Sequence, residues 1–292
     1  MATTDRSLAH WSEEGRREME AFYALAHLDY EVLAKALDWP TALREVANRT
    51  HNAAKLTLLD VACGSGKFPA ALLEHGDIGS LAHDLPIAYD LLDPSAFSLE
   101  EAARELKPPF IEGAGHEVTL EDLDPAAGPF DVVWATHALY AMDPTHVTSG
   151  IERFLAAIAP GGFGVIAQGA RPGHYHRFYE AYLADVAGDD VVPYVATEDL
   201  IEALRAAGAQ PTVRRLTYDH VVADADTAVL EGYLQRCAFD DATSLEQMRA
   251  APTLGAYLES CHDAERGEHR FTQQVDLILL DPPASASEGA SA

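Results

Sequence analysis

The sequence predicts a doubly wound, Rossmann-like α/β fold, and three observations carry this prediction. Residues 58–68 (LLDVACGSGKF) combine a short apolar strand with a glycine-rich turn, which lets the backbone approach a ligand closely. The helix expected at 68–75 directs the free N–H groups of its first turn to an electron-rich group. Asp93 ends the next expected strand, where a carboxylate can accept both hydroxyls of a ribose. The sequence thus predicts a nucleoside ligand on this sheet.

The spacing of the glycines narrows the class of nucleoside. A phosphate-binding P-loop has Lys and then Ser or Thr after its last glycine, whereas Gly66-Lys67 is followed by Phe68. Val61 occupies the position where a P-loop would have its first glycine. A dinucleotide-binding turn needs a third glycine three residues after the second, and Pro69 stands there. The pattern excludes a P-loop and argues against a nicotinamide or flavin site.

The elements of the first half follow from hydrophobic periodicity and from helix and turn signals. Residues 9–47 are expected to be helical, with a break at Trp39-Pro40. Core strands are expected at 57–62, 86–92, 110–111, 130–135 and 163–168, and core helices at 68–75, 98–106 and 145–159. Residues 113–129 are expected to be irregular, and Pro160-Gly161-Gly162 to stop the last helix and form a turn. Such alternation predicts a parallel sheet.

The second half is richer in helices. Helices are expected at 174–187, 197–207, 226–236 and 244–261, and strands at 211–216 and 275–280. The two strands are expected to close the sheet as an antiparallel pair. The chain then divides into an N-terminal helical cover (1–50), a nucleoside-binding core (51–170), helical insertions with the final strands (171–281) and a disordered tail (282–292).

Composition excludes several classes of protein. The chain has 292 residues, of which 48% are hydrophobic, so it can bury a large core. Its net charge of −27 argues against a nucleic-acid partner, because phosphate binding needs clustered Lys and Arg. The apolar runs are too short to span a bilayer, and the N-terminus lacks the pattern of a signal peptide. With three cysteines, an odd number, we expect a reducing cytoplasm rather than a disulfide framework.

The sequence predicts no metal site. No group of His and Cys residues has the spacing of zinc ligands along the chain. The segment His174-Tyr175-His176 is interpreted as polar and aromatic lining.

The pattern Asp60-x-x-x-Gly64-x-Gly66, with Asp93 closing the second strand, resembles motif I and its acidic partner in class I S-adenosylmethionine (SAM) methyltransferases. That resemblance implies SAM as cofactor and a sheet that ends in an antiparallel strand.

Over nearly its whole length the chain also resembles the histamine N-methyltransferase family. The matching segments are Arg6-Ser7-Leu8, Glu20-Ala21-Phe22, Asp93-Pro94-Ser95, His137 to Gly169, Asp189-Asp190 with Tyr194, Thr197 to Leu200, Cys237 to Asp240 and Phe271 to Gln274. The order and spacing of these segments carry the resemblance. It implies methyl transfer to a nitrogen of a small amine or imidazole-like compound.

The resemblance implies roles for individual residues. The cofactor would be bound by Asp60, Gly64, Gly66, Asp93, Ser98, Thr119, Leu120 and Thr136. The substrate would contact Phe22, Glu31, His137, Tyr140, His174, Phe178, Phe239 and Gln273. His137 and Gln273 replace a glutamine and an asparagine of the family, and His174 and Phe178 replace tryptophans. These departures change the size of the site, so histamine itself is not implied, whereas a small amine is.

Glu31 and His137 are the candidate catalytic residues. Glu31 would bind a substrate ammonium group through a charge-assisted hydrogen bond. His137 would accept a proton, because an unperturbed imidazole titrates near neutral pH. Blander interpretations stay open: Glu31 as a solvated helix residue, His137 as a buried structural residue, and Tyr140 and Phe239 as core residues.

Two other functions fit the same motifs. One is methyl transfer to an oxygen, sulfur or carbon atom of a small natural product. The other is a module that binds SAM without catalysis.

Overall fold

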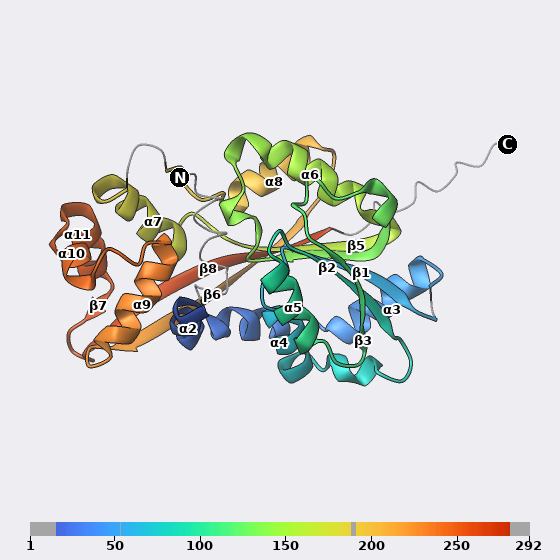
Figure 1. The fold of residues 1–292 in the computed structure, drawn as a ribbon, viewed down its shortest axis with the longest axis horizontal. Helices are drawn as coiled ribbons and strands as arrows, with labels where there is room; N and C mark the ends of the chain where they lie inside the picture. Colours follow the sequence, from blue (N-terminus) through green and yellow to red (C-terminus); the bar gives the residue numbers. More distant parts are fainter. Residues whose placement is uncertain (1–15, 53, 188–190, 281–292) are drawn as a thin grey trace.

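A computed structural model describes residues 16–52, 54–187 and 191–280, and side chains of the first helix from Phe22 onward. The segments at 6–8 and 189–190 and the tail at 282–292 lie outside these residues. Figure 1 shows an elongated molecule, with a twisted sheet between two layers of helices and a helical lobe at one end.

In the described residues, eight strands form one sheet in the order β3-β2-β1-β4-β5-β8-β6, with β7 paired to β8. The strands are β1 (Leu56–Val61), β2 (Ile87–Leu92), β3 (Phe110–His116), β4 (Phe130–Thr136), β5 (Ile158–Gly169), β6 (Thr212–Ala223), β7 (His262–Asp263) and β8 (Glu268–Leu280). Strands β1 to β5 pair in parallel, and β8 is antiparallel to both β5 and β6. The predicted fold class is confirmed, including the antiparallel closing pair.

Helices cover both faces of the parallel strands (Figure 1). One layer consists of α2 (Arg16–Lys35), α3 (Trp39–Arg49), α4 (Lys67–His75) and α5 (Ala96–Glu105), and the other of α6 (Val147–Ala156) and α8 (Thr197–Ala206). Each layer has its own apolar core against the sheet. In the first, Phe68 packs edge-on against Trp39 and Trp134, with ring centroids 5.4 and 5.0 Å apart. This cluster fixes α4, and with it the glycine turn, on the sheet.

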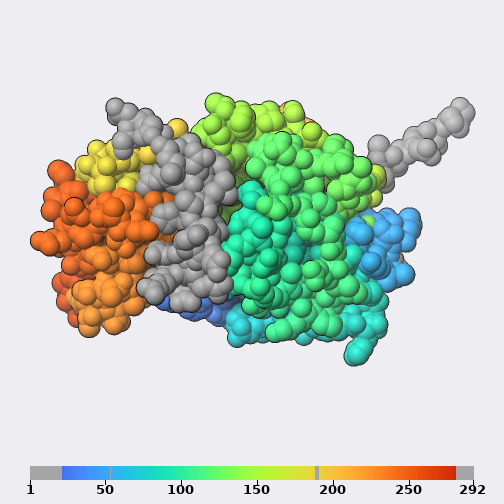
Figure 2. Space-filling view, in the orientation of Figure 1, coloured from blue at the N-terminus to red at the C-terminus, as the bar shows by residue number. Residues whose placement is uncertain are grey.

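A third core forms the lobe, which contains α7 (His174–Asp185), α9 (Thr227–Ala238), α10 (Leu245–Ala250) and α11 (Pro252–Ser260). The lobe exists because β6 and β8 continue beyond the parallel strands: β5 pairs with residues 275–280 of β8, whereas β6 pairs with 268–279. In Figure 2 the lobe is the orange end of the molecule, and the green residues of the sheet core lie on the other side.

Several predicted boundaries are wrong. The strands expected at 211–216 and 275–280 are longer, because β6 and β8 pair with each other from Thr212 and Leu279 to Ala223 and Glu268. Strand β3 extends to His116, into the segment expected to be irregular, because Leu91 and Leu92 pair with Gly115 and His116. The segment Pro160-Gly161-Gly162 lies inside β5 and bulges out of the β4–β5 ladder, since Phe130 pairs with Ile158 but Val132 with Phe163. Pro252 divides the helix expected at 244–261 into α10 and α11, since proline is favoured in the first turn of a helix.

None of the described helices is long and apolar enough to cross a membrane.

The β6–β8 ribbon offers a test of the architecture. Arg215 on β6 binds Asp276 on β8 through two hydrogen bonds of 2.7 and 2.8 Å, and Asp276 is buried. Arg215→Ala leaves that carboxylate without its cation, so we expect the free energy of unfolding to fall by about 1.5–3 kcal/mol. Urea denaturation would measure the change. The exposed Arg205 on α8 is the control, and Arg205→Ala should change stability by less than about 0.5 kcal/mol. Equal stability of the two variants would contradict the prediction.

Candidate functional site

The larger cavity, of about 560 Å³, opens at the carboxyl ends of β1, β2 and β4. This is where doubly wound sheets bind ligands. Its floor is formed by backbone and side chains that directly follow these strands: Ala62 to Ser65, Asp93-Pro94, and Thr136 to Ala138. Thr119 and Leu120 form part of the wall.

The two glycines of the turn have different tasks. Gly64 lines the cavity in a left-handed conformation, with φ +51°, and nothing lies within 4 Å of the place a Cβ would take. Gly66 precedes α4 with φ +71°, and a Cβ there would lie 2.9 Å from the Cα atom of Ala102 on α5. Gly64 therefore leaves room for a ligand, while Gly66 allows α4 and α5 to pack closely.

Asp93 is held in position from both of its oxygens. Its Oδ2 accepts the N–H of Gly64 at 3.0 Å, and its Oδ1 accepts the N–H of Ser95 at 2.9 Å. A further hydrogen bond comes from the side chain of Ser98. Burial raises the pKa of Asp93 even though these donors lower it. The carboxylate therefore faces the cavity in a fixed orientation, with lone pairs left for other donors.

Asp60 lies below the turn and does not line the cavity. It accepts a hydrogen bond of 2.7 Å from the hydroxyl of Tyr89. Burial raises the pKa of Asp60 to about 7, and the nearby charge of Asp93 adds to the increase. Asp60, Gly66 and Ser98 thus support the cavity from behind instead of lining it.

Helix α2 covers the site with two rows of side chains. Tyr23 and Tyr30 line the larger cavity, and Phe22, Asp29 and Tyr30 line a second, smaller one. The pairs 22/29 and 23/30 are each two helical turns apart, so each pair lies on one side of the helix. Burial raises the pKa of Tyr23 to about 12, so its hydroxyl stays protonated.

The second cavity, of about 70 Å³, lies between α2, the end of β5 and the lobe. His137, Tyr30 and Tyr140 line both cavities and mark the place where they meet. The walls are largely aromatic and consist of Phe22, Tyr30, Tyr140, Tyr175, Tyr194 and Phe239.

Asp29 is the buried carboxylate of this second cavity, with 2% of its surface exposed. It accepts hydrogen bonds from the hydroxyls of Tyr175 at 2.6 Å and Tyr218 at 2.7 Å, and the Nε2 atom of His220 lies 2.8 Å away. Burial by itself would raise the pKa of Asp29, but the charge of His220 and its hydrogen bond outweigh burial and lower it. Asp29 is therefore ionised at neutral pH.

His137 follows β4 in a left-handed conformation, with φ +51°. Its backbone N–H donates to the carbonyl of Ala167. Burial lowers the pKa of His137, although the charge of Asp29 opposes that effect, so the imidazole is neutral at neutral pH. Its Nε2 is buried and makes no hydrogen bond within the described residues, and the same holds for the Oε1 of Gln168. Gln168 also lines the second cavity.

The structure brings together most of the residues that the sequence singled out. Those that line the larger cavity are Gly64, Asp93, Thr119, Leu120, Thr136, His137 and Tyr140. Phe22 and Phe239 line the second cavity. Three others are buried in the lobe behind the second cavity: His174, Phe178 and Gln273. The side chain of Gln273 donates a hydrogen bond to the hydroxyl of Tyr233 at 3.0 Å. The ring of His174 forms a hydrogen bond with the hydroxyl of Tyr257 at 2.8 Å.

Glu31 is not part of either cavity. Its carboxylate binds Lys35, four residues along α2, at 2.5 Å, and 30% of its side chain is exposed. Glu31 and Asp29 point in different directions, because residues two positions apart on a helix are rotated by about 200° around its axis. The carboxylate that does face the cavity is Asp29, which the sequence interpretation missed. Tyr23 and Tyr30 are seven residues apart, and this spacing could have indicated which face of α2 lies against the rest of the molecule.

The larger cavity suits a nucleoside that carries a sulfonium group. A fixed carboxylate, Asp93, stands where ribose hydroxyls would be bound, and Gly64 leaves space beside it. The apolar side chains of Leu120 and Met142 offer contacts to a flat base. The rings of Tyr23 and Tyr30 can face a positive charge.

Comparison with known proteins agrees with this geometry. Residues 59–163 match the family model described as a methyltransferase domain. The chain is 30% identical over 154 residues to an alpha N-terminal protein methyltransferase of Arabidopsis thaliana, a match that covers 48% of this chain and 49% of that protein. The chain thus spans about half the length of this curated relative.

Two solved structures resemble the fold. One is a provisionally assigned methyltransferase of Bacillus halodurans, with 14% identity, a TM-score of 0.52, and coverage of 82% of this chain and 99% of that one. The other is magnesium protoporphyrin IX methyltransferase of Synechocystis with bound S-adenosylhomocysteine, with 11% identity, a TM-score of 0.52, and coverage of 94% and 99%. The predictions of a SAM-dependent methyltransferase domain and of SAM as its cofactor are confirmed by the match over residues 59–163. The two solved structures support the fold.

The role of Asp93 can be measured by cofactor binding. Asp93→Ala removes the carboxylate that we expect to accept the ribose hydroxyls, and with it the partner of the Gly64 N–H. We expect S-adenosylhomocysteine to bind at least about tenfold more weakly, from the 1.5–3 kcal/mol that a charged hydrogen bond contributes. Isothermal calorimetry would give both affinities. The control is Asp84→Ala, at an exposed position before β2. An unchanged affinity in the Asp93 variant would remove Asp93 from the cofactor site.

Proposed function

We propose that this chain transfers the methyl group of SAM to a nitrogen of a small amine or imidazole-like compound. One observation carries the proposal. The cavity next to the cofactor site presents hydrogen-bond acceptors: the ionised Asp29, the Oε1 of Gln168 and the ring nitrogen of His137.

These acceptors favour a substrate with N–H groups. A carboxylate has about four acceptor positions. Tyr175 and Tyr218 donate to two of those on Asp29, and the Nε2 atom of His220 lies 2.8 Å from one of its oxygens. A remaining position on Asp29 and the free Oε1 of Gln168 would both accept from a substrate. Buried acceptors without donors are costly, so a ligand that donates to them is bound with a gain in free energy.

Charge and aromatic walls support a cationic or neutral amine. Ring faces attract cations, and the stacked pair Tyr140 and Phe239, with centroids 6.0 Å apart, forms one wall. The buried guanidinium of Arg236 stands over Phe239 at 5.8 Å. Arg236 also lines this cavity, and its positive charge would repel an ammonium group that came close to it.

The reaction needs a deprotonated nitrogen aligned with the methyl donor. When bound, SAM supplies an electrophilic methyl carbon. The residues of this chain align the nitrogen and exclude water. Alignment and exclusion of water supply most of the rate enhancement in such a displacement. His137 lines both cavities and is neutral, so its Nε2 can accept a hydrogen bond or a proton from the reacting nitrogen.

Two further observations bear on the identity of the amine. The segments that resemble the histamine N-methyltransferase family favour a small amine, but the curated relative that matches this chain is not a histamine N-methyltransferase. The Arabidopsis relative is named as a methyltransferase of protein α-amino termini, which makes the N-terminal amine of a peptide the second candidate. The volume of the second cavity, about 70 Å³, favours the small amine.

A transfer assay distinguishes these candidates. Purified protein and SAM labelled in the methyl group are incubated with small amines and imidazoles, with phenols and thiols, and with peptides whose N-terminus is free or acetylated. We expect label in the small amines. Label only in free-N-terminal peptides would support the second candidate, label in phenols or thiols would contradict nitrogen as the acceptor, and cofactor binding without transfer would indicate a non-catalytic module.

Two carboxylates on α2 can be compared directly. Asp29→Asn keeps the shape of the side chain and removes the charge in the cavity. For a cationic amine we expect kcat/KM to fall about ten- to a hundredfold, from 1.5–3 kcal/mol per charged hydrogen bond. Glu31→Gln is the matched control and should leave kcat/KM nearly unchanged, because Glu31 binds Lys35 outside the cavity. Unchanged affinity for S-adenosylhomocysteine would show that both variants are folded. A larger fall of kcat/KM in Glu31→Gln than in Asp29→Asn would show that Glu31 binds the ammonium group.

The pH dependence of the reaction tests His137. Activity that requires neutral His137 falls as pH drops through its pKa, which burial places below the 6.5 of an exposed histidine. We expect the wild-type acid limb of kcat/KM to lie below that pH. His137→Gln should keep part of the activity and lose this limb. The substrate must not titrate between pH 5 and 9. Identical acid limbs in both proteins would make His137 a structural residue.

A further inference from the structure

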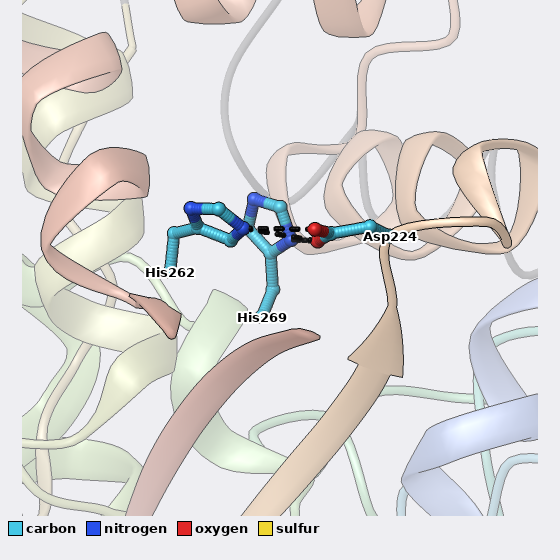
Figure 3. Close-up of side chains that lie close together, drawn as sticks. All are labelled: Asp224, His262 and His269. Carbon is cyan, nitrogen blue, oxygen red and sulfur yellow. Dashed lines mark hydrogen bonds and ion pairs between the residues drawn. The ribbon is translucent and has the colours of Figure 1, made fainter. Parts of the chain in front are cut away.

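Three potential metal ligands meet at the tip of the lobe, on the far side from the cofactor cavity. Asp224 follows β6, His269 lies near the start of β8, and His262 begins β7. His262 and His269 are cross-strand partners, and His269 also pairs with Val222 on β6. Three neighbouring segments of the sheet therefore place their side chains together. Figure 3 shows both imidazole rings directed to the carboxylate of Asp224.

The distances suit one small cation. The Nε2 atom of His262 lies 3.0 Å from one oxygen of Asp224, and the Nδ1 atom of His269 lies 3.4 Å from the other. All three potential ligand atoms lie within 4.8 Å of one another. Ligands at about 2.0–2.1 Å from a tetrahedral Zn²⁺ are about 3.3–3.4 Å apart. Small shifts of the side chains would bring these atoms to that geometry.

One of the three potential ligands is buried and the other two are accessible to solvent, as in a metal site that is open on one side. His269 is 5% exposed, and its Nδ1 makes no hydrogen bond within the described residues. Asp224 is exposed and His262 is half-buried, so a cation can enter from solvent. A buried ring nitrogen that makes no hydrogen bond costs free energy, which a bound cation would offset.

We propose that Asp224, His262 and His269 bind a divalent transition-metal ion of the Zn²⁺ class, with water as a further ligand. Two imidazoles and one carboxylate favour such ions, whereas Mg²⁺ and Ca²⁺ prefer oxygen ligands. The ion joins the two-residue strand β7 to β8 and to the end of β6. It thereby fastens the outer end of the lobe, whose helix α9 and the Phe239 that follows it form part of the second cavity. This proposal is independent of the proposed function.

Spacing along the chain did not predict this site. The histidines are seven residues apart and Asp224 precedes them by 38 residues, a pattern unlike that of zinc motifs. The hairpin pairing of β7, β8 and β6 brings them together.

The test uses the full chain without an affinity tag, dialysed against a chelator. Zn²⁺ is titrated by calorimetry, Co²⁺ by visible absorption, and Mg²⁺ serves as the contrasting cation. We expect about one Zn²⁺ per chain, a raised melting temperature with Zn²⁺, and Co²⁺ absorption bands of a site with nitrogen ligands. Asp224→Ala and His262→Ala should each weaken Zn²⁺ binding at least about a hundredfold, since even second-shell changes cost ten- to a hundredfold. Both variants should lose the thermal shift.

The control is His83→Ala, an exposed histidine outside the cluster, which should bind Zn²⁺ like the wild type. Asp224 is exposed, so its variant is expected to fold, and circular dichroism would check this. Equal Zn²⁺ affinity in the wild type and in the Asp224 and His262 variants would overturn the proposal. Binding of Mg²⁺ as tight as that of Zn²⁺ would overturn the assignment to a transition metal.

Discussion

The buried carboxylate of Asp29 connects the parts of this molecule that form the substrate cavity. It lies on α2 and receives hydrogen bonds from Tyr175 on α7 and Tyr218 on β6, with His220 beside it. Removing a charge from water is unfavourable unless partners compensate for it, so α2, α7 and β6 have to stay in contact around Asp29. The covering helix, the lobe and the extended ribbon thus meet at one ionised group, and the second cavity lies beside that contact.

A second group of residues supports the two cavities without lining them. Asp60 lies below the glycine turn, Ser98 bonds Asp93, and Gly66 lets α4 pack closely on α5. Behind the aromatic wall lie His174, Phe178 and Gln273. Resemblance to a family places such residues near a site, since it compares positions along a chain. Whether a side chain lines a cavity or lies behind it depends on packing, which a pattern in one chain does not contain.

A structural feature could be predicted from the sequence where the residues that determine it lie close together along the chain. Strand β1, the glycine turn, α4 and Asp93 form within about forty residues, and each has its own turn, cap or strand signal, so the cofactor site could be predicted. On α2 the family resemblance singled out Glu31, whereas the carboxylate that lines the second cavity is Asp29. The second cavity joins residues from Phe22 to Phe239, and the long β6–β8 pairing decides where they meet. No local pattern specifies contacts of that range.

The two rows of side chains on α2 give the two binding events a common element. Tyr23 and Tyr30 contact the space for the cofactor, and Phe22 and Asp29 the space for the acceptor. One helix therefore forms part of the wall of both spaces. If binding of the cofactor orders α2, the loss of conformational entropy is not repeated when the acceptor binds, and thermodynamic reciprocity would make the effect the same in the other direction. A displacement of α2 would change the shape of both spaces at once.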